Sequence, residues 1–600
     1  MNKLSSPGLN GFGPSFFATF WATVSQDVLG MFSSFYDGTI DLSRINRAFL
    51  VLLPKIDATV HPSQFCPISL QNYVMKAITK VLMTWLQATI HALVDADQTG
   101  FLSGRHISEN IVYVADLLRC CQSRKAPTLV FKIDFRKAFD SVNWSSLLAI
   151  LKTRGFDERW CLWMERILDT GHTAILLNGV PRCWIRCRNG LRLGDPLSPY
   201  LFIIVADVLQ RLIRNAWASG TIAHPLSPDT PCPVLQYADD NLILCKASTE
   251  AAACLKQVLD DFALATGLVI NFHKSCFIPM HVGSGDAASM ATFLGCPISS
   301  FPQPYLGLPL SPTKLPASAF APLSSPLIVG FLAGVRIFCP LGEGGFGIKD
   351  LHRQNRCLLL NVVHKLHQSN PLPWKTWFYS HTGRDLGDFS ASPSFLEKIV
   401  AECLPLCCAI TRATVVDGHS TSFWMDKWLP GDMLATRFPA LFSHGTRRHA
   451  SVATVVSQGL GLQTRLTAAA ESELLVIRRF IDGTSLRGGP DRRAIDSPLT
   501  PRFSSREAYR ALSSVRPFDT TARLTWSLRI PTKVKIFAYL VDIDRLSTRV
   551  NLFYKSCAPS DICAACTSPE TGRHLFFDCH VSAAIWGRLD VPIPAGSFSI

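Results

Sequence analysis

The sequence predicts an α+β protein, and three segments carry this prediction. Residues 233–245 have the pattern of a β-hairpin with two adjacent aspartates at its turn. Residues 128–134 alternate like a strand that ends on an aspartate, and residues 198–213 have the apolar periodicity of a helix. A strand, a helix and a hairpin thus follow one another in one region, and we expect a protein of the α+β class.

The hairpin pattern places Asp239 and Asp240 between the apolar runs 233–236 and 242–245. Core packing does not explain two exposed aspartates at a turn, because acidic pairs repel unless a cation lies between them. A divalent cation such as Mg²⁺ is the natural candidate. The alternative is a solvated acidic turn on the surface, and the four residues alone do not decide between the two.

Asp134 supplies a third carboxylate. Period two puts Leu129, Phe131 and Ile133 on one face and Lys132 with Asp134 on the other, so Asp134 ends a strand on its polar side. An edge strand with a solvated aspartate is the alternative. Together with the acidic turn, Asp134 favours a two-metal site for phosphoryl transfer.

A glycine-containing loop at residues 189–197 leads into the predicted helix. Ser198 is expected to be the N-cap and Pro199 the first helical residue. Backbone N–H groups at such a junction suit a phosphate, although a plain loop and cap explain the segment equally well.

Four residues near the C-terminus have metal-ligand spacing. Cys563, Cys566, His574 and Cys579 form the pattern C-x2-C-x7-H-x4-C, which suits one tetrahedral Zn²⁺. Four protein ligands leave no open position, so the zinc is expected to be structural. Coincidence is the alternative, because the chain has 20 cysteines.

Composition limits the class of protein. Six hundred residues predict two to four domains, and 59 Lys and Arg against 45 Asp and Glu give a net charge of +14, which favours a polyanionic partner. The sequence has no apolar run long enough to span a bilayer and no signal-peptide pattern at its N-terminus. We expect an intracellular protein, nuclear or cytoplasmic, with no membrane partner.

The order of these segments resembles the palm of reverse transcriptases, specifically the non-LTR (LINE-type) retrotransposon polymerases abundant in plants. The resemblance is colinear from near Pro7 to Leu310, and its further matches are Ser5-Ser-Pro-Gly-Leu-Asn-Gly-Phe12, Phe65-Cys-Pro-Ile-Ser-Leu70, Gln98-Thr-Gly-Phe-Leu-Ser-Gly-Arg105, residues 267–275 and residues 301–310. The Cys/His segment resembles the zinc-binding domain that follows the polymerase in this family.

The resemblance implies a fold and residue roles. It implies an RNA-directed DNA polymerase that uses an RNA template, a DNA primer and dNTPs, with two Mg²⁺ ions held by Asp134, Asp239 and Asp240. Phe139 falls where the family has its steric gate against ribose, with a core aromatic as the alternative. Three basic residues fall at positions near the nucleotide, template or pyrophosphate, where solvated surface is the alternative: Lys55, Arg192 and Lys274.

The implied architecture is a right-hand polymerase with an antiparallel palm sheet, followed by a mostly helical connector and a small zinc-binding domain. The expected parts are fingers and palm entrance at 1–125, palm at 126–310, a remnant of a largely deleted thumb at 311–343, connector at 344–450, linker at 451–500 and zinc-binding domain at 503–589. An upstream endonuclease domain and a downstream ribonuclease H segment are not expected in this chain.

Three positions depart from the family pattern. Cys66 stands where the family has an arginine that contacts the triphosphate, Trp85 replaces another arginine, and Leu193 replaces a glutamine. Cysteine cannot make the bidentate, charge-assisted contact of arginine with phosphate, so weaker dNTP binding is expected. The alternative function is a catalytically inactive nucleic-acid-binding relic of a retroelement. An intron-encoded maturase shares the palm but would not be expected to have the zinc domain.

Overall fold

The computed structural model describes residues 5–55, 59, 61–320, 350–368, 372–382, 389, 393–497, 502–513, 528, 530–542, 546–554 and 557–590. The chain divides into two compact units. The first comprises residues 1–315, 365–405 and 414–492, and the second comprises residues 316–364, 406–413 and 493–600. No helix among the described residues is both long and apolar enough to cross a membrane.

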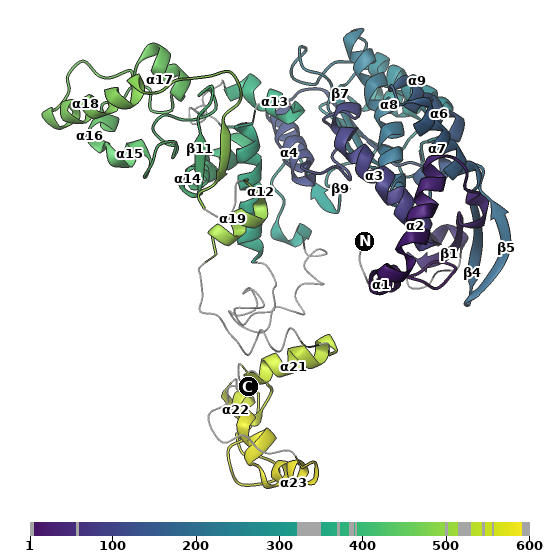
Figure 1. The fold of residues 1–600 in the computed structure, drawn as a ribbon. Coiled ribbons are helices and arrows are strands. Elements are labelled where there is room, and N and C mark those ends of the chain that lie inside the picture. The colour runs from purple at the N-terminus through teal and green to yellow at the C-terminus, as the bar shows by residue number, and fades with distance from the viewer. Residues whose placement is uncertain are drawn as a thin grey trace. The chain divides into compact units, whose positions relative to one another are not determined.

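The N-terminal part of the first unit contains a four-stranded sheet of order β2-β1-β4-β5, which we call the N-terminal sheet. β1 pairs antiparallel with β2 and parallel with β4, and β5 forms the outer edge, as Figure 1 shows. The elements of this part are α1 (Pro14–Thr19), α2 (Trp21–Tyr36), β1 (Arg47–Pro54), β2 (Phe65–Gln71), α3 (Tyr73–Leu93), α4 (Ile107–Ser123), β4 (His172–Leu177) and β5 (Val180–Arg186), with 3-10 turns at Leu42–Arg44 and Pro62–Gln64.

A second sheet of order β6-β7-β3-β8, which we call the central sheet, is antiparallel throughout. The predicted antiparallel sheet is therefore confirmed. Its strands are β3 (Thr128–Ile133), β6 (Val234–Tyr237), β7 (Asp240–Lys246) and β8 (Cys276–Met280). The associated helices are α5 (Ala138–Ser141), α6 (Trp144–Thr153), α7 (Glu158–Asp169), α8 (Ser198–Ala218), α9 (Thr249–Thr266) and α10 (Ser284–Leu294).

Helices α6, α8 and α9 lie side by side next to this sheet (Figure 1) and contribute to one apolar core. Phe131 and Ile243 from the sheet meet Phe202 and Leu209 of α8 in this core, and each of the four side chains is at most 1% exposed. Burial of this kind stabilises a protein by roughly 25 cal/mol for each Å² of apolar surface removed from water. The core therefore holds the strands that carry the three predicted aspartates.

The loop before α8 differs from the prediction. Ser198 is the first helical residue and not the N-cap. Asp195 Oδ1 accepts hydrogen bonds from Leu197 N (2.7 Å) and Ser198 N (3.4 Å), so the aspartate satisfies the free donors at the helix start. The prediction of Ser198 as cap was wrong because Asp195 reaches the same N–H groups from three residues upstream.

A short hairpin of β9 (Gln303–Tyr305) and β10 (Leu308–Leu310) follows the central sheet. A 3-10 turn at Ala317–Phe320 comes next. Of the segment 311–343, which was expected to be a thumb remnant, residues 321–343 lie outside the described residues.

Helices α13 (Pro373–Thr382) and α14 (Phe395–Ile410) pack against α4 in the first unit. Two buried acids of α4 organise this contact. Glu109 pairs with Lys365 and accepts from Trp374 Nε1 (3.3 Å). Asp116 accepts from Trp377 Nε1 at 3.0 Å, and from the backbone N–H at the start of α14 at 2.8 Å. Buried carboxylates are tolerated here because each has donors.

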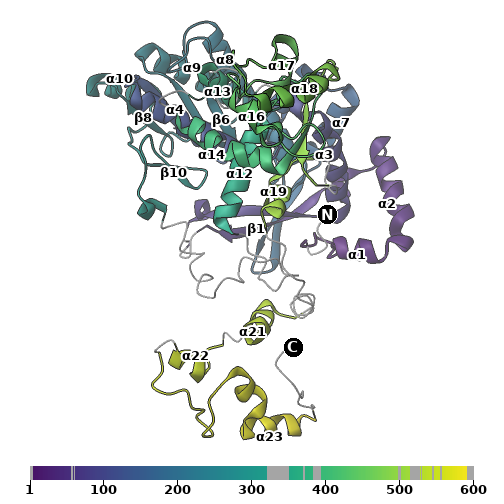
Figure 2. The same cartoon turned by 90° about the vertical axis from the view of Figure 1, so that its left-hand side faces the viewer.

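Residues 451–497 are folded, so the prediction of a linker at 451–500 is wrong for the described residues. They form α17 (Val452–Gln458), α18 (Ala468–Asp482) and β12 (Arg492–Ile495). Trp424, Val452 and Ile477 are fully buried in one core, to which α15 (Leu434–Arg437) and α16 (Pro439–Ser443) also contribute. Figure 2 shows α16, α17 and α18 together. Composition misled the prediction because alanine-rich segments also build small helices.

Most of helix α12 (Leu351–Leu366) belongs to the second unit. Most of strand β11 (Thr411–Thr414), which pairs with β12, also belongs to it. Its C-terminal helices are α19 (Ser505–Ala511), α21 (Thr532–Asp542), α22 (Arg549–Tyr554) and α23 (His580–Arg588). A π-turn at His574–Asp578 precedes α23.

One carboxylate holds the loop that opens the segment 414–492. Asp491 accepts from Val416 N (2.7 Å), Gly418 N (2.9 Å) and Thr421 Oγ1 (2.8 Å), and from both N and Oγ of Ser420 (3.2 Å each). Burial alone would raise the pKa of Asp491, but these hydrogen bonds lower it below its usual value.

We predict that Asp491→Ala lowers the free energy of unfolding of this segment by about 2–4 kcal/mol, because five donors lose a charged acceptor. The folded pKa is lowered, so the contribution is present at neutral pH and is lost as the pH falls through that folded pKa. Hydrogen exchange of peptides from residues 414–492 measures the change. The exposed Asp482→Ala is the matched control, and equal exchange in both variants would contradict the assignment.

Candidate functional site

The two adjacent aspartates lie at the tip of a tight hairpin. The pairing of β6 with β7 ends at Tyr237 opposite Asp240, which leaves Ala238 and Asp239 as a two-residue turn. Ala238 has a φ of 56°, in the left-handed region that such a turn requires at its first position. The predicted hairpin is confirmed, and both aspartates reach solvent.

Asp134 lies directly after β3, level with this turn. β3 pairs with β7 as far as Ile133 opposite Asn241, so Asp134 is one residue beyond the pairing. Asp134 N donates to Ser275 Oγ (3.0 Å), and Asn271 N donates to Asp134 O (2.8 Å). Because β3 is paired on both sides, by β7 and β8, the alternative of an edge strand is wrong.

The three carboxylates act on one another. Burial raises the pKa of Asp239, and the charge of Asp134 raises it further. Burial, Asp239 and Asp134 raise the pKa of Asp240, while Lys132 lowers it. The turn therefore carries negative charge that the protein only partly compensates, which is a condition that favours cation binding.

A cleft of about 770 Å³ opens beside the turn. Its walls come from the N-terminal sheet, from residues 137–144 and from the loop before α8. Predicted site residues and departures from the family pattern meet in these walls, namely Lys55, Cys66, Phe139, Arg192, Leu193 and Asp239.

Phe139 contributes both to the cleft and to the core. Its ring is half-buried and stacks on Phe202, with centroids 4.5 Å apart and planes 17° apart. Close by, burial raises the pKa of Asp140, and the charges of Lys137 and Lys55 oppose this rise. Lys55 is therefore an exposed positive charge in the wall that contains Phe139.

Arg192 anchors the loop to the N-terminal sheet. Its guanidinium donates to the Asn46 side chain, to Asn46 O (3.2 Å) and to His172 O (3.4 Å). The neighbouring Leu193 O accepts from Ser69 N (2.9 Å) on β2. The loop is thus fixed to β1, β2 and β4, and the side of the cleft that it forms is prearranged.

Lys274 is exposed in the turn at residues 272–274 and is not part of the cleft wall. Hydrogen bonds through Asn271 nevertheless link this turn to Asp134. Asn271 N donates to Asp134 O (2.8 Å), and Asn271 O accepts from Lys274 N (3.0 Å). The structure brings Lys274 to the strand end that carries Asp134.

Sequence reasoning missed Asp195 and Gln98. Asp195 is buried, caps α8 and accepts from Gln71 Nε2 (3.1 Å) on β2. Gln98 accepts a hydrogen bond from the turn residue Ala238. An aspartate three residues before a helix start could have indicated the cap. The role of Gln98 depends on tertiary contact, which no local pattern reveals.

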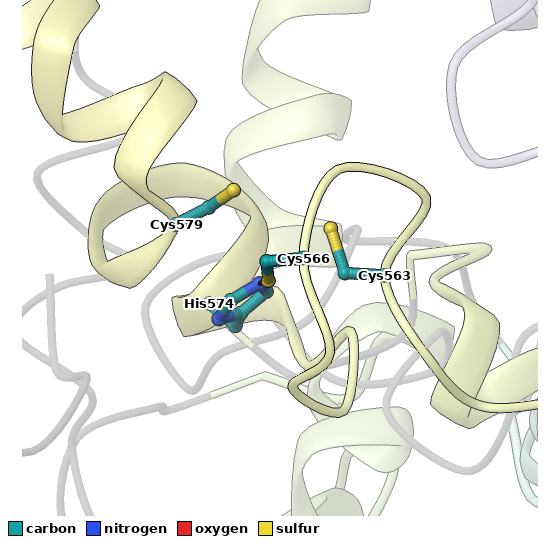
Figure 3. A group of neighbouring side chains, drawn as sticks. All are labelled: Cys563, Cys566, His574 and Cys579. Atoms are coloured by element: carbon teal, nitrogen blue, oxygen red, sulfur yellow. Dashed lines mark hydrogen bonds between the residues drawn. The ribbon is translucent and has the colours of Figure 1, made fainter.

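The four predicted zinc ligands lie together, as Figure 3 shows. Their ligand atoms are all within 4.8 Å of one another, and Cys566 Sγ lies 3.1 Å from His574 Nε2. Ala565 N donates to Cys563 Sγ (3.4 Å), which with the contact of His574 lowers the pKa of that thiol to about 7. A thiolate of this kind fits the N/S ligand set of zinc.

Local structure explains this clustering. Cys563 N donates to Ser568 O (2.9 Å), which closes the turn that contains the first two cysteines. His574 begins the π-turn, and Cys579 ends it and precedes α23. Among the described residues, these four form a group that could hold a metal ion.

We predict that Asp239→Asn stabilises the metal-free protein at pH 7–8. A raised folded pKa means that stability falls as the pH rises from the unfolded value through the folded one, so the ionised carboxylate is unfavourable at neutral pH. The gain should be below about 1 kcal/mol, because solvent screens the repulsion. Thermal unfolding at pH 5 and pH 8 tests it against the exposed control Asp229→Asn, and equal shifts in both would contradict the repulsion.

Replacement of Cys563 and Cys566 by serine is predicted to reduce bound zinc from about one ion per chain to none, because two of four ligands are lost. Elemental analysis of the full chain gives the stoichiometry. Cys183→Ser, at an exposed cysteine far from the group in sequence, should leave the zinc unchanged. Zinc retained by the double variant, or absent from the unmodified chain, would refute the site.

Residues 53–298 match the family model of the reverse transcriptase (RNA-dependent DNA polymerase). Residues 503–586 match that of zinc-binding in reverse transcriptase. The chain is similar to the transposon TX1 uncharacterized 149 kDa protein of Xenopus laevis, with 25% identity over 45% of this chain and 20% of that protein.

It is also similar to the retrovirus-related Pol polyprotein from type-1 retrotransposable element R2 of Nasonia vitripennis, with 26% identity over 40% of this chain and 23% of that protein. The matched part of the chain thus spans about a fifth of the length of these relatives. A solved structure of apo telomerase from Candida tropicalis, truncated from its C-terminal domain, matches with a TM-score of 0.31 and 13% identity over 40% of this chain and 51% of that chain.

The two family matches, in this order along one chain, together with the similarity to R2 polyproteins, show that the chain belongs to the non-LTR reverse transcriptases with a C-terminal zinc-binding domain.

Proposed function

We propose that the chain is an RNA-directed DNA polymerase of a LINE-type retroelement, which extends a DNA primer on an RNA template. The observation that supports this most is the position of Asp134 level with the turn that carries Asp239 and Asp240, at the edge of the cleft. Polymerisation requires carboxylates next to a space that can hold a nucleoside triphosphate. The cleft of about 770 Å³ is large enough for such a ligand.

Mg²⁺ fits the donors at this turn. The three side chains offer hard carboxylate oxygens only, and their mutual effect on pKa indicates negative charge without full compensation. When bound, two Mg²⁺ ions supply alignment of the primer 3′-hydroxyl with the α-phosphate and neutralise the charge that develops there. Asp134, Asp239 and Asp240 are the proposed ligands, and we expect them to draw closer in the loaded site.

Residues of the cleft wall would orient the nucleotide. Phe139 is fixed by its stack on Phe202, so its ring can serve as a rigid gate against a ribose 2′-hydroxyl. Lys55 presents a positive charge to a triphosphate in the same cleft. Lys274 is exposed near the strand end of Asp134, and its proposed role is to interact with the leaving pyrophosphate.

Arg192 has a more limited proposed role. Since its guanidinium donates to Asn46 and to the carbonyl of His172, its first effect is to position the loop. Contact of this loop with template or nucleotide would therefore come through its backbone and through Leu193, with Arg192 as support. The family position of this loop beside template and nucleotide is therefore compatible with the observed contacts of Arg192 to Asn46 and His172.

Cys66 is the departure from the family pattern that is expected to impair catalysis most, because it weakens the binding of the nucleotide phosphates. It lines the cleft where the family has an arginine, and it is half-buried in β2. A charge-assisted bond to phosphate contributes about twice as much as a neutral one, and a thiol provides none. This favours the second candidate function, an inactive protein that still binds nucleic acid through its basic surface.

The zinc-binding domain would contribute structure and nucleic-acid contact but no chemistry, because four protein ligands leave no open coordination position. The proposed deletion of most of the thumb would weaken the grip on the duplex. That grip depends mainly on backbone contacts, whose strength falls steeply with salt. We therefore expect weak, distributive synthesis.

Primer extension on an RNA template with dNTPs and Mg²⁺ tests the function. We expect short products per binding event, and loss of activity by at least about 100-fold in Asp240→Asn, with primer-template binding kept. Cys66→Arg with Leu193→Gln should lower the KM for dNTP without lengthening the products, since both positions line the nucleotide cleft.

A trap for released enzyme gives the product length in a single cycle. Long products from the unmodified chain would contradict the loss of the thumb. No incorporation with Mg²⁺ or Mn²⁺, by protein that still binds primer-template, would instead establish the inactive relic.

A further inference from the structure

Residues 97–100 contact the acidic turn through the side chain of Gln98. Gln98 Oε1 accepts hydrogen bonds from two backbone N–H groups, Ala238 N at 3.0 Å and Gly100 N at 2.9 Å. The Gln98 side chain is fully buried, so both bonds are shielded from water. A single amide oxygen thus ties the turn to a segment about 140 residues away in sequence.

We propose that Gln98 is a positioning residue, which fixes the backbone of Ala238 and thereby aims Asp239 and Asp240. The role of the two carboxylates rests on the proposed polymerase function, whereas the contact itself does not depend on it. Gln98 has no contact with substrate in this proposal. It acts through the turn.

The turn needs such support because of its backbone conformation. Ala238 has a φ of 56°, which residues other than glycine, asparagine and aspartate seldom adopt. A bond to its N–H favours the left-handed conformation over the extended alternatives. Release of that bond would let the peptide rotate, and the side chains of Asp239 and Asp240 would move with it.

Residues 97–100, which we call the brace, are rigid because their backbone is paired with β6. Thr99 N donates to Gln236 O (2.9 Å), and Gln236 N donates to Asp97 O (3.3 Å). Asn110 Nδ2 on α4 donates to the same Gln236 O at 3.2 Å. Gln98 and Gln236 form a parallel bridge on the side of β6 that β7 leaves free.

Gly100 completes the brace by close approach. A Cβ atom at this position would lie 2.5 Å from Ala238 N and 3.2 Å from Tyr237 C, which are backbone atoms that cannot move aside. Only glycine therefore allows the segment to contact the turn so closely. The brace depends on Gln98 for the bond and on Gly100 for the space.

Packing alone does not account for glutamine at position 98. Within the part of the chain that the structure describes, its Nε2 is buried and has no hydrogen-bond partner. An unpaired buried donor is unfavourable, and an apolar side chain of the same size would avoid it. The acceptor Oε1 is the group that makes glutamine useful here.

The test compares Gln98→Met, which keeps the volume but removes the acceptor, with Gln98→Glu, which keeps an acceptor oxygen. Gln210→Met is the matched control, because Gln210 is equally buried and donates to Asp97 Oδ2 (2.8 Å) without contact to the turn. Hydrogen exchange with residue-level fragmentation reports on the Ala238 amide in the full chain. Primer extension gives kcat and the KM for dNTP.

Gln98→Met should accelerate exchange at the Ala238 amide by roughly ten-fold or more, because the turn can then open locally without wider unfolding. It should lower kcat by roughly ten-fold with the KM for dNTP changed less than about two-fold, since the contact acts on the carboxylates and not on nucleotide binding. Gln98→Glu keeps the acceptor oxygen and should restore the protection of the Ala238 amide, but not kcat, because a buried carboxylate adds negative charge next to the acidic turn. Gln210→Met should change neither the exchange rate at Ala238 nor kcat by a comparable factor.

Unchanged exchange at Ala238 in Gln98→Met, or equal acceleration in Gln210→Met, would overturn the proposal. If the unmodified chain extends no primer, the proposed polymerase function fails, and the exchange data still decide whether Gln98 holds the turn.

Discussion

The position of β3 at the centre of the central sheet is the constraint on which the rest of the site depends. β7 and β8 pair with it on both sides, and its register with β7 places Asp134 level with the turn between β6 and β7. Because one residue of slippage would turn every side chain to the other face, burial of Phe131 and Ile133 in the core fixes this register. Apolar packing thus determines where the carboxylates are.

The same packing allows the site to carry unfavourable electrostatics. Asp239 and Asp240 have raised pKa values because burial and neighbouring carboxylates oppose their ionisation, and the turn has a left-handed residue at Ala238. Functional sites commonly retain such strain when the surrounding structure is stable enough to hold it. Here the core on one side and the brace around Gln98 on the other provide that stability.

Local patterns predicted much of the site, and tertiary contacts account for what they missed. The acidic hairpin, the strand before Asp134 and the cluster of Cys563 with His574 all follow from spacing within a few residues, and the structure contains them. The roles of Gln98 and Asp195 arise from contacts across more than 120 residues, which no short pattern contains. The linker prediction failed because composition does not show that residues such as Val452 and Ile477 are buried together.

Anomalous diffraction from crystals soaked in Mn²⁺ tests the central claim most directly, namely that the strand end and the turn form a divalent-cation site. We predict two anomalous peaks bounded by the carboxylates of Asp134, Asp239 and Asp240, with the side chains closer together than in the metal-free protein. Peaks confined to other acidic residues, or an empty turn at saturating Mn²⁺ with a bound primer-template and nucleotide, would contradict it.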